Sequence, residues 1–159
     1  MTIRVGLGFD VHGFGGDGPL VLGGVTIPDA VGLVGHSDAD VVAHAIADAL
    51  LGAAGLPDLG TLFPASDEQY RGVSSLALLG DVTARVAVAG WHAANVDVVV
   101  AAERPPLAAH IPAMAANISA VLGAPVSVKP KRAEGVGAVG RGEGIAAWAV
   151  ALLESIGSS

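Results

Sequence analysis

The segment over residues 3–12 constrains the fold most, because its two faces consist of different kinds of side chain. The residues alternate with a period of two, which is the repeat of a β-strand. Large apolar side chains occupy one face: Val5, Leu7, Phe9 and Val11. Glycines and polar side chains occupy the other face: Gly6, Gly8, Asp10 and His12. We therefore expect a strand that presents a carboxylate and an imidazole side by side.

Strand-like and helix-like patterns follow one another along the rest of the chain. A hairpin is expected over residues 19–27, and further strands are expected over residues 95–102 and 126–129. Helices are expected over residues 38–53, 74–90, 107–122 and 145–156. Because strands and helices are mixed and no repeat or linker separates them, the order predicts one α/β or α+β domain over residues 1–159.

The composition excludes several classes of function. The 159 residues include no cysteine, so the chain has no disulfide, no thiolate metal site and no cysteine nucleophile. The net charge of −7 argues against nucleic acid or an anionic membrane as the main partner. One of the longest apolar runs, residues 145–153, is far shorter than the roughly 18 residues of a membrane span. The first residues lead directly into a strand without a signal-peptide pattern, so we expect a cytoplasmic protein.

The apolar content is high for a chain of this size. Apolar residues make up 52% of the sequence, while only 14% is charged and 4% is aromatic. A domain so poor in charge has few side chains with which to cover its surface, and large exposed apolar patches usually mark interfaces. The composition is consistent with an oligomer, and equally with a chain that is merely rich in alanine.

The pair Asp10 and His12 is the first candidate for a functional site. Two residues apart on a strand, both side chains leave the same face. Asp40, His44 and Asp48 are spaced by four and form one stripe of a helix. If strand and helix pack together, Asp10, His12 and His44 form a typical zinc-binding set with an open fourth position, and Asp40 or Asp48 would orient the imidazole of His44. The alternative is a hydrogen-bonded core histidine beside a solvated helix face.

A basic, glycine-rich segment is the second candidate. Four of the eight basic residues lie within thirteen positions: Lys129, Lys131, Arg132 and Arg141. Glycines between residues 135 and 144 let backbone N–H groups approach an anion, and a helix beginning near Ile145 would add its positive end. Glu134 or Glu143 could hold a second, oxygen-preferring cation that is shared with phosphate oxygens. A solvated turn with local ion pairs is the alternative.

The dipeptide His36-Ser37 is the third candidate, because it precedes the helix expected from residue 38. Backbone donors at this position, together with the two side chains, could bind a phosphate. Alternatively, Ser37 simply caps the helix, since Ser37-Asp38-Ala39-Asp40 has the pattern of a capping box.

Six motifs occur in an order that resembles a known family. They are Gly8-Phe9-Asp10-Val11-His12, Gly35-His36-Ser37-Asp38-Ala39-Asp40-Val41, His44-Ala45-Ile46-Ala47-Asp48-Ala49-Leu50-Leu51, Asp58-Leu59-Gly60, Leu62-Phe63-Pro64 and Gly140-Arg141-Gly142-Glu143-Gly144-Ile145. Together, and over essentially the whole chain, they resemble the 2-C-methyl-D-erythritol 2,4-cyclodiphosphate synthases of non-mevalonate isoprenoid biosynthesis. The resemblance implies a mainly four-stranded sheet covered by helices on one face. It also implies a homotrimer with active sites between subunits.

The same resemblance implies the reaction and the metals. These enzymes cyclise a cytidine diphosphate ester of methylerythritol 2-phosphate and release CMP by metal-assisted phosphoryl transfer. Zn²⁺, or another divalent transition metal, would be held by residues matching Asp10, His12 and His44. Mg²⁺ or Mn²⁺ would be held by the residue matching Glu134. His36, Arg132 and Glu134 are the implied catalytic residues.

The implied substrate contacts are spread over several parts of the chain. They are Asp10, His12, His36, Ser37, Asp58, Gly60, Phe63, Asp67, Ala102, Pro105, Leu107, Lys131, Arg132, Ala133, Glu134 and Arg141. The chain departs from the family pattern at Ala133, where a threonine is usual, and at Pro106, where a lysine is usual. It departs again at Ala65, where an acid is common, and at Ala138, where an aromatic residue is usual.

These departures leave two alternatives to the cyclase. One is a metal-dependent phosphate-ester hydrolase with a changed substrate, because the loop Lys131-Arg132-Ala133 differs from the family pattern. The other is a catalytically weak trimer that binds nucleotide or isoprenoid phosphates. For the cyclase itself, we expect Arg132 to replace the hydroxyl contact that Ala133 lacks by a charge-assisted hydrogen bond.

Overall fold

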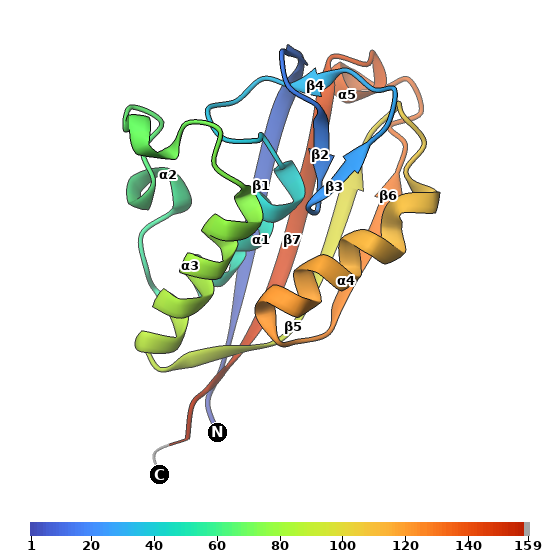
Figure 1. Ribbon diagram of the computed structural model, residues 1–159. Helices are drawn as coiled ribbons and strands as arrows, with labels where there is room; N and C mark the ends of the chain where they lie inside the picture. The colour runs from blue at the N-terminus through green and yellow to red at the C-terminus, as the bar shows by residue number, and fades with distance from the viewer. Residues whose placement is uncertain (158–159) are drawn as a thin grey trace.

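The protein folds around a mixed five-stranded sheet (Figure 1). The structure is a computed structural model, which describes residues 1–157. The predicted domain, residues 1–159, thus extends two residues beyond the described part. The strands lie in the order β4-β1-β7-β5-β6. Their bounds are β1 Ile3–Gly16, β4 Gly32–Leu33, β5 Trp91–Ala101, β6 Val126–Lys131 and β7 Gly144–Ser155. Only β5 and β6 are parallel, and β1 and β5 both pair with β7 in antiparallel fashion.

The sheet has one strand more than the expected four. The additional strand β4 has only two residues and pairs with the distal end of β1 through Phe14 and Gly16. So short a strand carries no detectable period of two, and no strand was therefore predicted for these residues. The expected hairpin is present as β2 (Leu20–Leu22) and β3 (Val25–Ile27), which form a separate two-stranded sheet.

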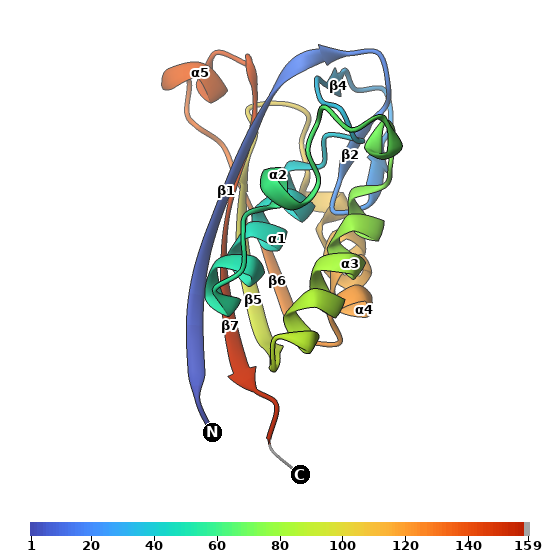
Figure 2. The same cartoon turned by 90° about the vertical axis from the view of Figure 1, so that its left-hand side faces the viewer.

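Three longer helices lie on the same face of the five-stranded sheet (Figure 2). They are α1 (Val41–Ala54), α3 (Ser75–Val88) and α4 (Ile111–Leu122). The connections also contain short helices: α2 (Leu59–Leu62), α5 (Gly137–Gly140) and two 3-10 turns, η1 (Glu68–Tyr70) and η2 (Ala108–His110). Within residues 1–157 no helix is long and apolar enough to cross a membrane.

The helix expected over residues 145–156 is wrong, because this segment is the central strand β7. Alanine favours helices, and four alanines lie between positions 146 and 151, so the local propensity of this segment favours a helix. In the fold, Ala147, Ala149 and Ala151 face the helices and are buried, while Trp148 and Val150 point to the opposite face. Pairing with β1 on one side and β5 on the other outweighs a helix propensity of a few tenths of a kcal/mol per residue.

Helix α1 packs directly on β1, because β1 offers two glycines to it. A Cβ atom built on Gly6 would lie 1.9 Å from the carbonyl oxygen of Ala49, and one on Gly8 would lie 1.8 Å from that of Ala45. The helix therefore touches the strand backbone itself. Eleven of the fourteen residues of α1 are buried as a result. This contact brings the polar face of β1 against the helix that carries His44.

Asp40, and not Ser37, caps α1. Its carboxylate accepts hydrogen bonds from the N–H groups of Val42 and Ala43, as an N-cap does. It also accepts bonds from the N–H groups of Gly23 and Gly24, so it ties the β2–β3 turn to the helix. The expected capping box is thus wrong, because the helix begins at Val41, three residues after the predicted start at Asp38.

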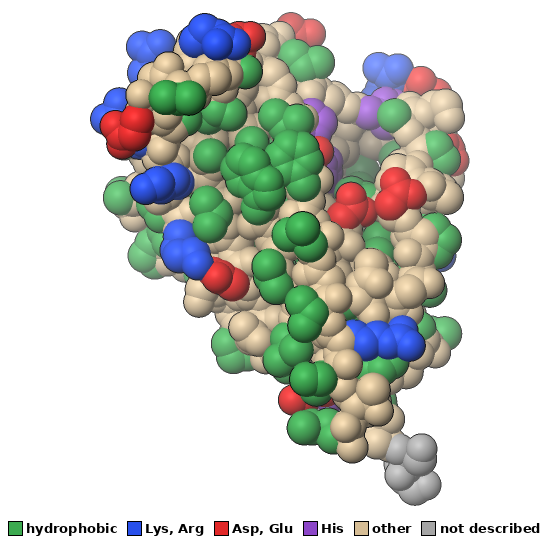
Figure 3. Space-filling model, turned by 180° about the vertical axis from the view of Figure 1, so that it is seen from behind, with side chains coloured by type: hydrophobic (Ala, Val, Ile, Leu, Met, Phe, Trp, Pro, Cys, Tyr) green, Lys and Arg blue, Asp and Glu red, His purple; other side chains and the backbone are tan. Residues whose placement is uncertain are grey.

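Within residues 1–157, the other face of the sheet carries none of the three longer helices and is strongly apolar (Figure 2). We call this surface the apolar stripe: Ile3, Val5, Leu7, Phe9 and Val11 on β1 with Trp148 and Val150 on β7. These side chains are between 43% and 69% exposed. Figure 3, which views the molecule from behind, shows hydrophobic side chains running along this face. So large an apolar patch is typical of an interaction surface.

Candidate metal centre and active site

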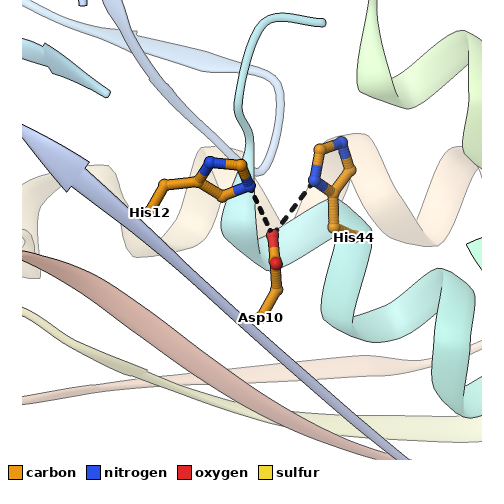
Figure 4. A group of neighbouring side chains, drawn as sticks. All are labelled: Asp10, His12 and His44. Atoms are coloured by element: carbon orange, nitrogen blue, oxygen red, sulfur yellow. Dashed lines mark hydrogen bonds and ion pairs between the residues drawn. The ribbon is translucent and has the colours of Figure 1, made fainter. Parts of the chain in front are cut away.

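Asp10, His12 and His44 converge where β1 meets α1 (Figure 4). One carboxylate oxygen of Asp10, Oδ2, lies 3.1 Å from Nε2 of His12 and 3.0 Å from Nδ1 of His44. The alternation along β1 places Asp10 and His12 on one face, and the contact of Gly6 and Gly8 with α1 brings His44 to them. The potential ligand atoms of the three residues lie within 4.8 Å of one another.

The hydrogen bonds of His12 indicate which of its ring atoms is available to a cation. Its Nδ1 lies 2.6 Å from the carbonyl oxygen of Val34, which can only accept, so Nδ1 carries the hydrogen. A neutral His12 then directs the lone pair of Nε2 at the carboxylate of Asp10. Two lone pairs repel each other unless a proton or a metal ion lies between them. Two imidazole nitrogens and one carboxylate oxygen are a donor set typical of zinc.

The pKa values agree with a cationic centre at Asp10. Burial alone would raise the pKa of Asp10, but hydrogen bonds and charge interactions with His12 and His44 in their protonated forms outweigh it and lower the pKa to about 2. The hydrogen bond to Asp10 raises the pKa of His12, although burial opposes the change. Asp10 is therefore a carboxylate throughout the neutral range, and its negative charge favours a cation at the atoms that face it.

Asp40 and Asp48, which we expected to orient His44, make hydrogen bonds to other groups instead. Asp40 is fully buried and bonds to backbone N–H groups, as described above. Asp48 accepts a hydrogen bond of 2.7 Å from the N–H of Leu59 and so holds the start of α2. Nε2 of His44 instead lies 2.7 Å from Oγ of Ser75 and 3.2 Å from Oγ of Ser37. The expectation failed because a spacing of four along one helix says nothing about side chains from other elements.

A cavity of about 260 Å³ surrounds the metal-ligand candidates. It is lined by Asp10, His12, His36, Ser37, His44, Asp48, Leu59, Gly60, Phe63, Ala65, Tyr70 and Leu78. Nε2 of His36 donates to the carbonyl oxygen of Asp67 at 3.1 Å, which joins the loop before α1 to the loop after α2. Asp58 lies at the N-terminus of α2 and accepts a bond from Thr61. We call the cavity of about 260 Å³ around Asp10, His12 and His44 the metal-side cavity.

A second cavity of about 430 Å³ lies where β5 and β6 end. Its lining comprises Ala102, Glu103, Arg104, Pro105, Pro106, Leu107, Ala108, Pro130, Lys131 and Arg132. We call it the β5–β6 cavity. It shares no lining residue with the metal-side cavity, so the predicted substrate contacts that line these cavities fall into two separate groups. The remaining predicted contacts line neither of the two: Asp58, Asp67, Ala133, Glu134 and Arg141.

Glu103 holds the basic loop in a way that the sequence did not indicate. Its carboxylate accepts hydrogen bonds from Arg132 Nη2 and from the N–H of Ala133, both at 3.0 Å. Burial alone would raise the pKa of Glu103, but these hydrogen bonds lower it overall. Arg132, which we expected to contact a phosphate, is thus paired within the chain. No local signal could have revealed a partner that lies 29 residues away.

Glu134 and Arg141 line neither cavity in the described part of the chain. Glu134 is exposed and has a positive φ of 54°, while Arg141 pairs with Glu143 at 2.6 Å. The helix that was to offer its positive end near Ile145 does not exist, because β7 occupies this segment. The short α5 lies in its place within the glycine-rich loop.

Known proteins share both the sequence and the fold of this chain. The YgbB family matches residues 3–154. The 2-C-methyl-D-erythritol 2,4-cyclodiphosphate synthase of Bordetella petrii is 54% identical over 156 residues, which cover 96% of either chain.

Two solved structures are similar at the level of the whole fold. The bifunctional IspDF of Campylobacter jejuni has a TM-score of 0.93 at 40% identity and covers 97% of this chain, which in turn spans only 42% of that longer protein. A CDP complex of IspF from Plasmodium falciparum has a TM-score of 0.83 at 34% identity, covering 98% of this chain and 97% of that one. With the metal-ligand triad and the six motifs in place, the chain belongs to the YgbB family of 2-C-methyl-D-erythritol 2,4-cyclodiphosphate synthases.

Proposed function

We propose that the chain converts 4-diphosphocytidyl-2-C-methyl-D-erythritol 2-phosphate into 2-C-methyl-D-erythritol 2,4-cyclodiphosphate and CMP. The observation that carries the proposal is the convergence of Asp10, His12 and His44 in a cavity that also contains His36 and Ser37. The relative that is 54% identical over nearly the full length is named for this activity. The enzyme is then a lyase that acts on a phosphorus–oxygen bond.

The reaction is an intramolecular displacement at phosphorus. An oxygen of the 2-phosphate attacks the β-phosphorus and forms the new phosphorus–oxygen bond that closes the ring. The bond from the β-phosphorus to the oxygen bridging to the α-phosphorus breaks, and its electron pair leaves with CMP. Because the nucleophile belongs to the substrate, catalysis rests mainly on positioning and on the neutralisation of phosphate charge.

The residues of the metal-side cavity have the chemistry for this task. Asp10, His12 and His44 would hold Zn²⁺ there. Glu134, which does not line this cavity, would hold Mg²⁺ or Mn²⁺ at the diphosphate. Bound divalent cations polarise phosphate oxygens and neutralise the charge that develops on them. His36 and Ser37 lie at the edge of the same cavity, where they can steady the attacking phosphate by hydrogen bonds. Asp58, Gly60, Phe63 and Asp67 would contact the ribose and the methylerythritol.

The cytidine half of the substrate is assigned to the β5–β6 cavity. Ala102, Pro105 and Leu107 line it and present backbone groups and apolar surface to a flat base. Lys131 lies beside them and can contact the diphosphate, whereas Arg132 would first have to leave Glu103. A relative of similar length and fold is known as a complex with CDP. Arg141, which does not line this cavity, stays a predicted contact of the diphosphate.

Separate cavities on one chain support a homotrimer whose active sites lie between subunits. The metal-side cavity of one subunit would face the β5–β6 cavity of the next. The apolar stripe supports the same arrangement, because a second and a third copy would cover side chains that a lone subunit exposes to water. The acidic, cysteine-free composition supports a cytoplasmic location for this trimer.

A product assay tests the function. The purified protein is incubated with the phosphorylated cytidyl substrate, Zn²⁺ and Mg²⁺, and phosphorus NMR identifies the products. We expect the cyclic diphosphate and CMP. A linear hydrolysed product would favour a hydrolase, and binding without turnover would favour a regulator.

Two variants and one control complete this test. His12→Ala and His44→Ala should each lose bound zinc and CMP release, because each removes one of three ligands. His92→Ala is the control, since His92 is 53% exposed and pairs with Glu154 far from the ligand triad. Full activity of either ligand variant would refute the assignment.

A further inference from the structure

We propose that Ser75 and Asp38 position His44 as a metal ligand through a chain of two hydrogen bonds. The chain runs from the carboxylate of Asp38 through the hydroxyl of Ser75 to the imidazole of His44. The inference rests on the proposed metal site and adds two residues to it, neither of which the motif comparison assigned a role.

The three residues come from different parts of the fold. Asp38 belongs to the loop before α1, His44 to the first turns of α1, and Ser75 is the first residue of α3. Oγ of Ser75 lies 2.7 Å from Nε2 of His44 and is hydrogen-bonded to Oδ1 of Asp38. Ser75 is only 1% exposed, so this hydroxyl has no access to bulk water as an alternative partner.

The direction of each hydrogen bond follows from the inventory of donors. The carboxylate of Asp38 can only accept, so the single O–H of Ser75 donates to it. The oxygen of Ser75 is then free to accept, and Nε2–H of His44 is the donor that faces it. With its hydrogen on Nε2, a neutral His44 has its lone pair on Nδ1, which is the atom that faces Asp10.

The two histidines are thus fixed in opposite tautomers by different acceptors. The carbonyl of Val34 holds the hydrogen of His12 on Nδ1 and directs Nε2 inward. The Ser75–Asp38 pair holds the hydrogen of His44 on Nε2 and directs Nδ1 inward. Both rings then present lone pairs to the same point, as metal binding requires.

The hydroxyl of Ser75 is separable from the structural tie between Asp38 and α3. The backbone N–H of Ser75 donates to the other oxygen of Asp38, Oδ2, at 3.0 Å. Ser75→Ala keeps this backbone bond and removes the hydroxyl, and with it the bonds of Oγ to Asp38 Oδ1 and to His44 Nε2. Loss of a residue that orients a metal ligand typically lowers metal affinity 10- to 100-fold. We expect the lower end of this range, because Oγ of Ser37 at 3.2 Å can accept from Nε2 in its place.

The test measures Zn²⁺ affinity by competition with a chromophoric chelator, and the absorption spectrum of the Co²⁺-loaded protein. Ser75→Ala should bind Zn²⁺ about tenfold more weakly than wild type and should show altered Co²⁺ d–d bands. Ser74→Ala is the matched control, because Ser74 is exposed and its hydroxyl makes no capping bond within residues 1–157. It should match wild type in both measurements.

Asp38→Asn tests the other end of the hydrogen-bond chain independently. An amide can accept only one of the two bonds from Ser75, so the variant should also weaken Zn²⁺ binding several-fold. The double variant should lose less affinity than the product of the two single losses, because both residues act through one chain. Equal Zn²⁺ affinity and identical Co²⁺ spectra in Ser75→Ala, Ser74→Ala and wild type would overturn the proposal. Formation of cyclic product by wild type would in that case leave the proposed function intact.

Discussion

The close contact between β1 and α1 yields the sharpest prediction, the effect of Gly8→Ala. A Cβ atom at Gly8 would lie 1.8 Å from the carbonyl oxygen of Ala45 and 2.7 Å from the backbone nitrogen of Ala49. Both are backbone atoms of α1, so no side-chain rotation can make room. Strand and helix would have to separate by about 1 Å, since real Cβ contacts below 3.0 Å essentially do not occur.

The cost of that separation is large. Overpacking a core usually costs about 1–3 kcal/mol, and a gap of 0.5–1 Å forfeits roughly a quarter to a half of each dispersion contact. Because α1 buries eleven residues, we expect a loss of about 3 kcal/mol or more in the free energy of unfolding. For a chain of this length, such a loss corresponds to a fall in Tm of about 6–12 °C.

The same variant should impair metal binding. Asp10 lies two residues after Gly8, and His44 directly precedes Ala45, so the separation pulls the ligands apart. Metal–ligand distances tolerate deviations of only about 0.2 Å, and Zn²⁺ affinity should fall by at least about tenfold. Thermal unfolding and chelator competition measure the two effects.

Gly13→Ala is the control for Gly8→Ala. Gly13 lies on the same strand, but the nearest atom to its Cβ, the carbonyl oxygen of Glu143, is 3.6 Å away in ordinary contact. This variant should unfold within about 1–2 °C of wild type, because no atom has to move. A Gly8→Ala protein with the Tm and Zn²⁺ affinity of wild type would refute the account of how β1 and α1 form the site.

Three further predictions concern other parts of the molecule. Asp40→Ala leaves four backbone N–H groups without their acceptor and should lower the free energy of unfolding by about 3 kcal/mol or more, measured by urea denaturation; a loss below about 1 kcal/mol would contradict the role of this cap. Glu103→Gln should destabilise the protein at pH 7, because the pKa of Glu103 is lower in the folded protein than its ordinary value of about 4.3. The ionised carboxylate therefore adds stability above a pH of about 4.3, and this stability disappears as the pH falls through the lowered pKa. The gap in Tm between wild type and Glu103→Gln should therefore close in acid, and a gap that is constant with pH would exclude the charge as its cause. Leu7→Glu places a charge in the apolar stripe and should convert the proposed trimer into monomers with little CMP release. Sedimentation velocity and the product assay measure the two effects, and an active trimer would show that this stripe is not the interface.

The candidate metal ligands could be predicted because their geometry is local. A spacing of two on a strand determines that Asp10 and His12 share a face, whatever the strand pairs with. The position of His44 required one further step, namely that α1 packs on this face, and the glycines at positions 6 and 8 permit it. Ser75 and Glu103 could not be found in this way, because each acts on a residue about 30 positions away in the chain.

The sequence by itself determined the period of each local segment, the donor types available for a metal, the absence of cysteine chemistry and the surplus of apolar side chains. Only the tertiary structure decided that residues 144–155 form a central strand, that Asp40 and not Ser37 caps α1, and that the apolar stripe is left without helices. The physical reason is one of magnitude. The helix propensities of single residues differ by only a few tenths of a kcal/mol. The pairing of β7 on both of its sides and the burial of the Asp40 carboxylate involve several kcal/mol, and the residues that contribute this free energy are distant in sequence.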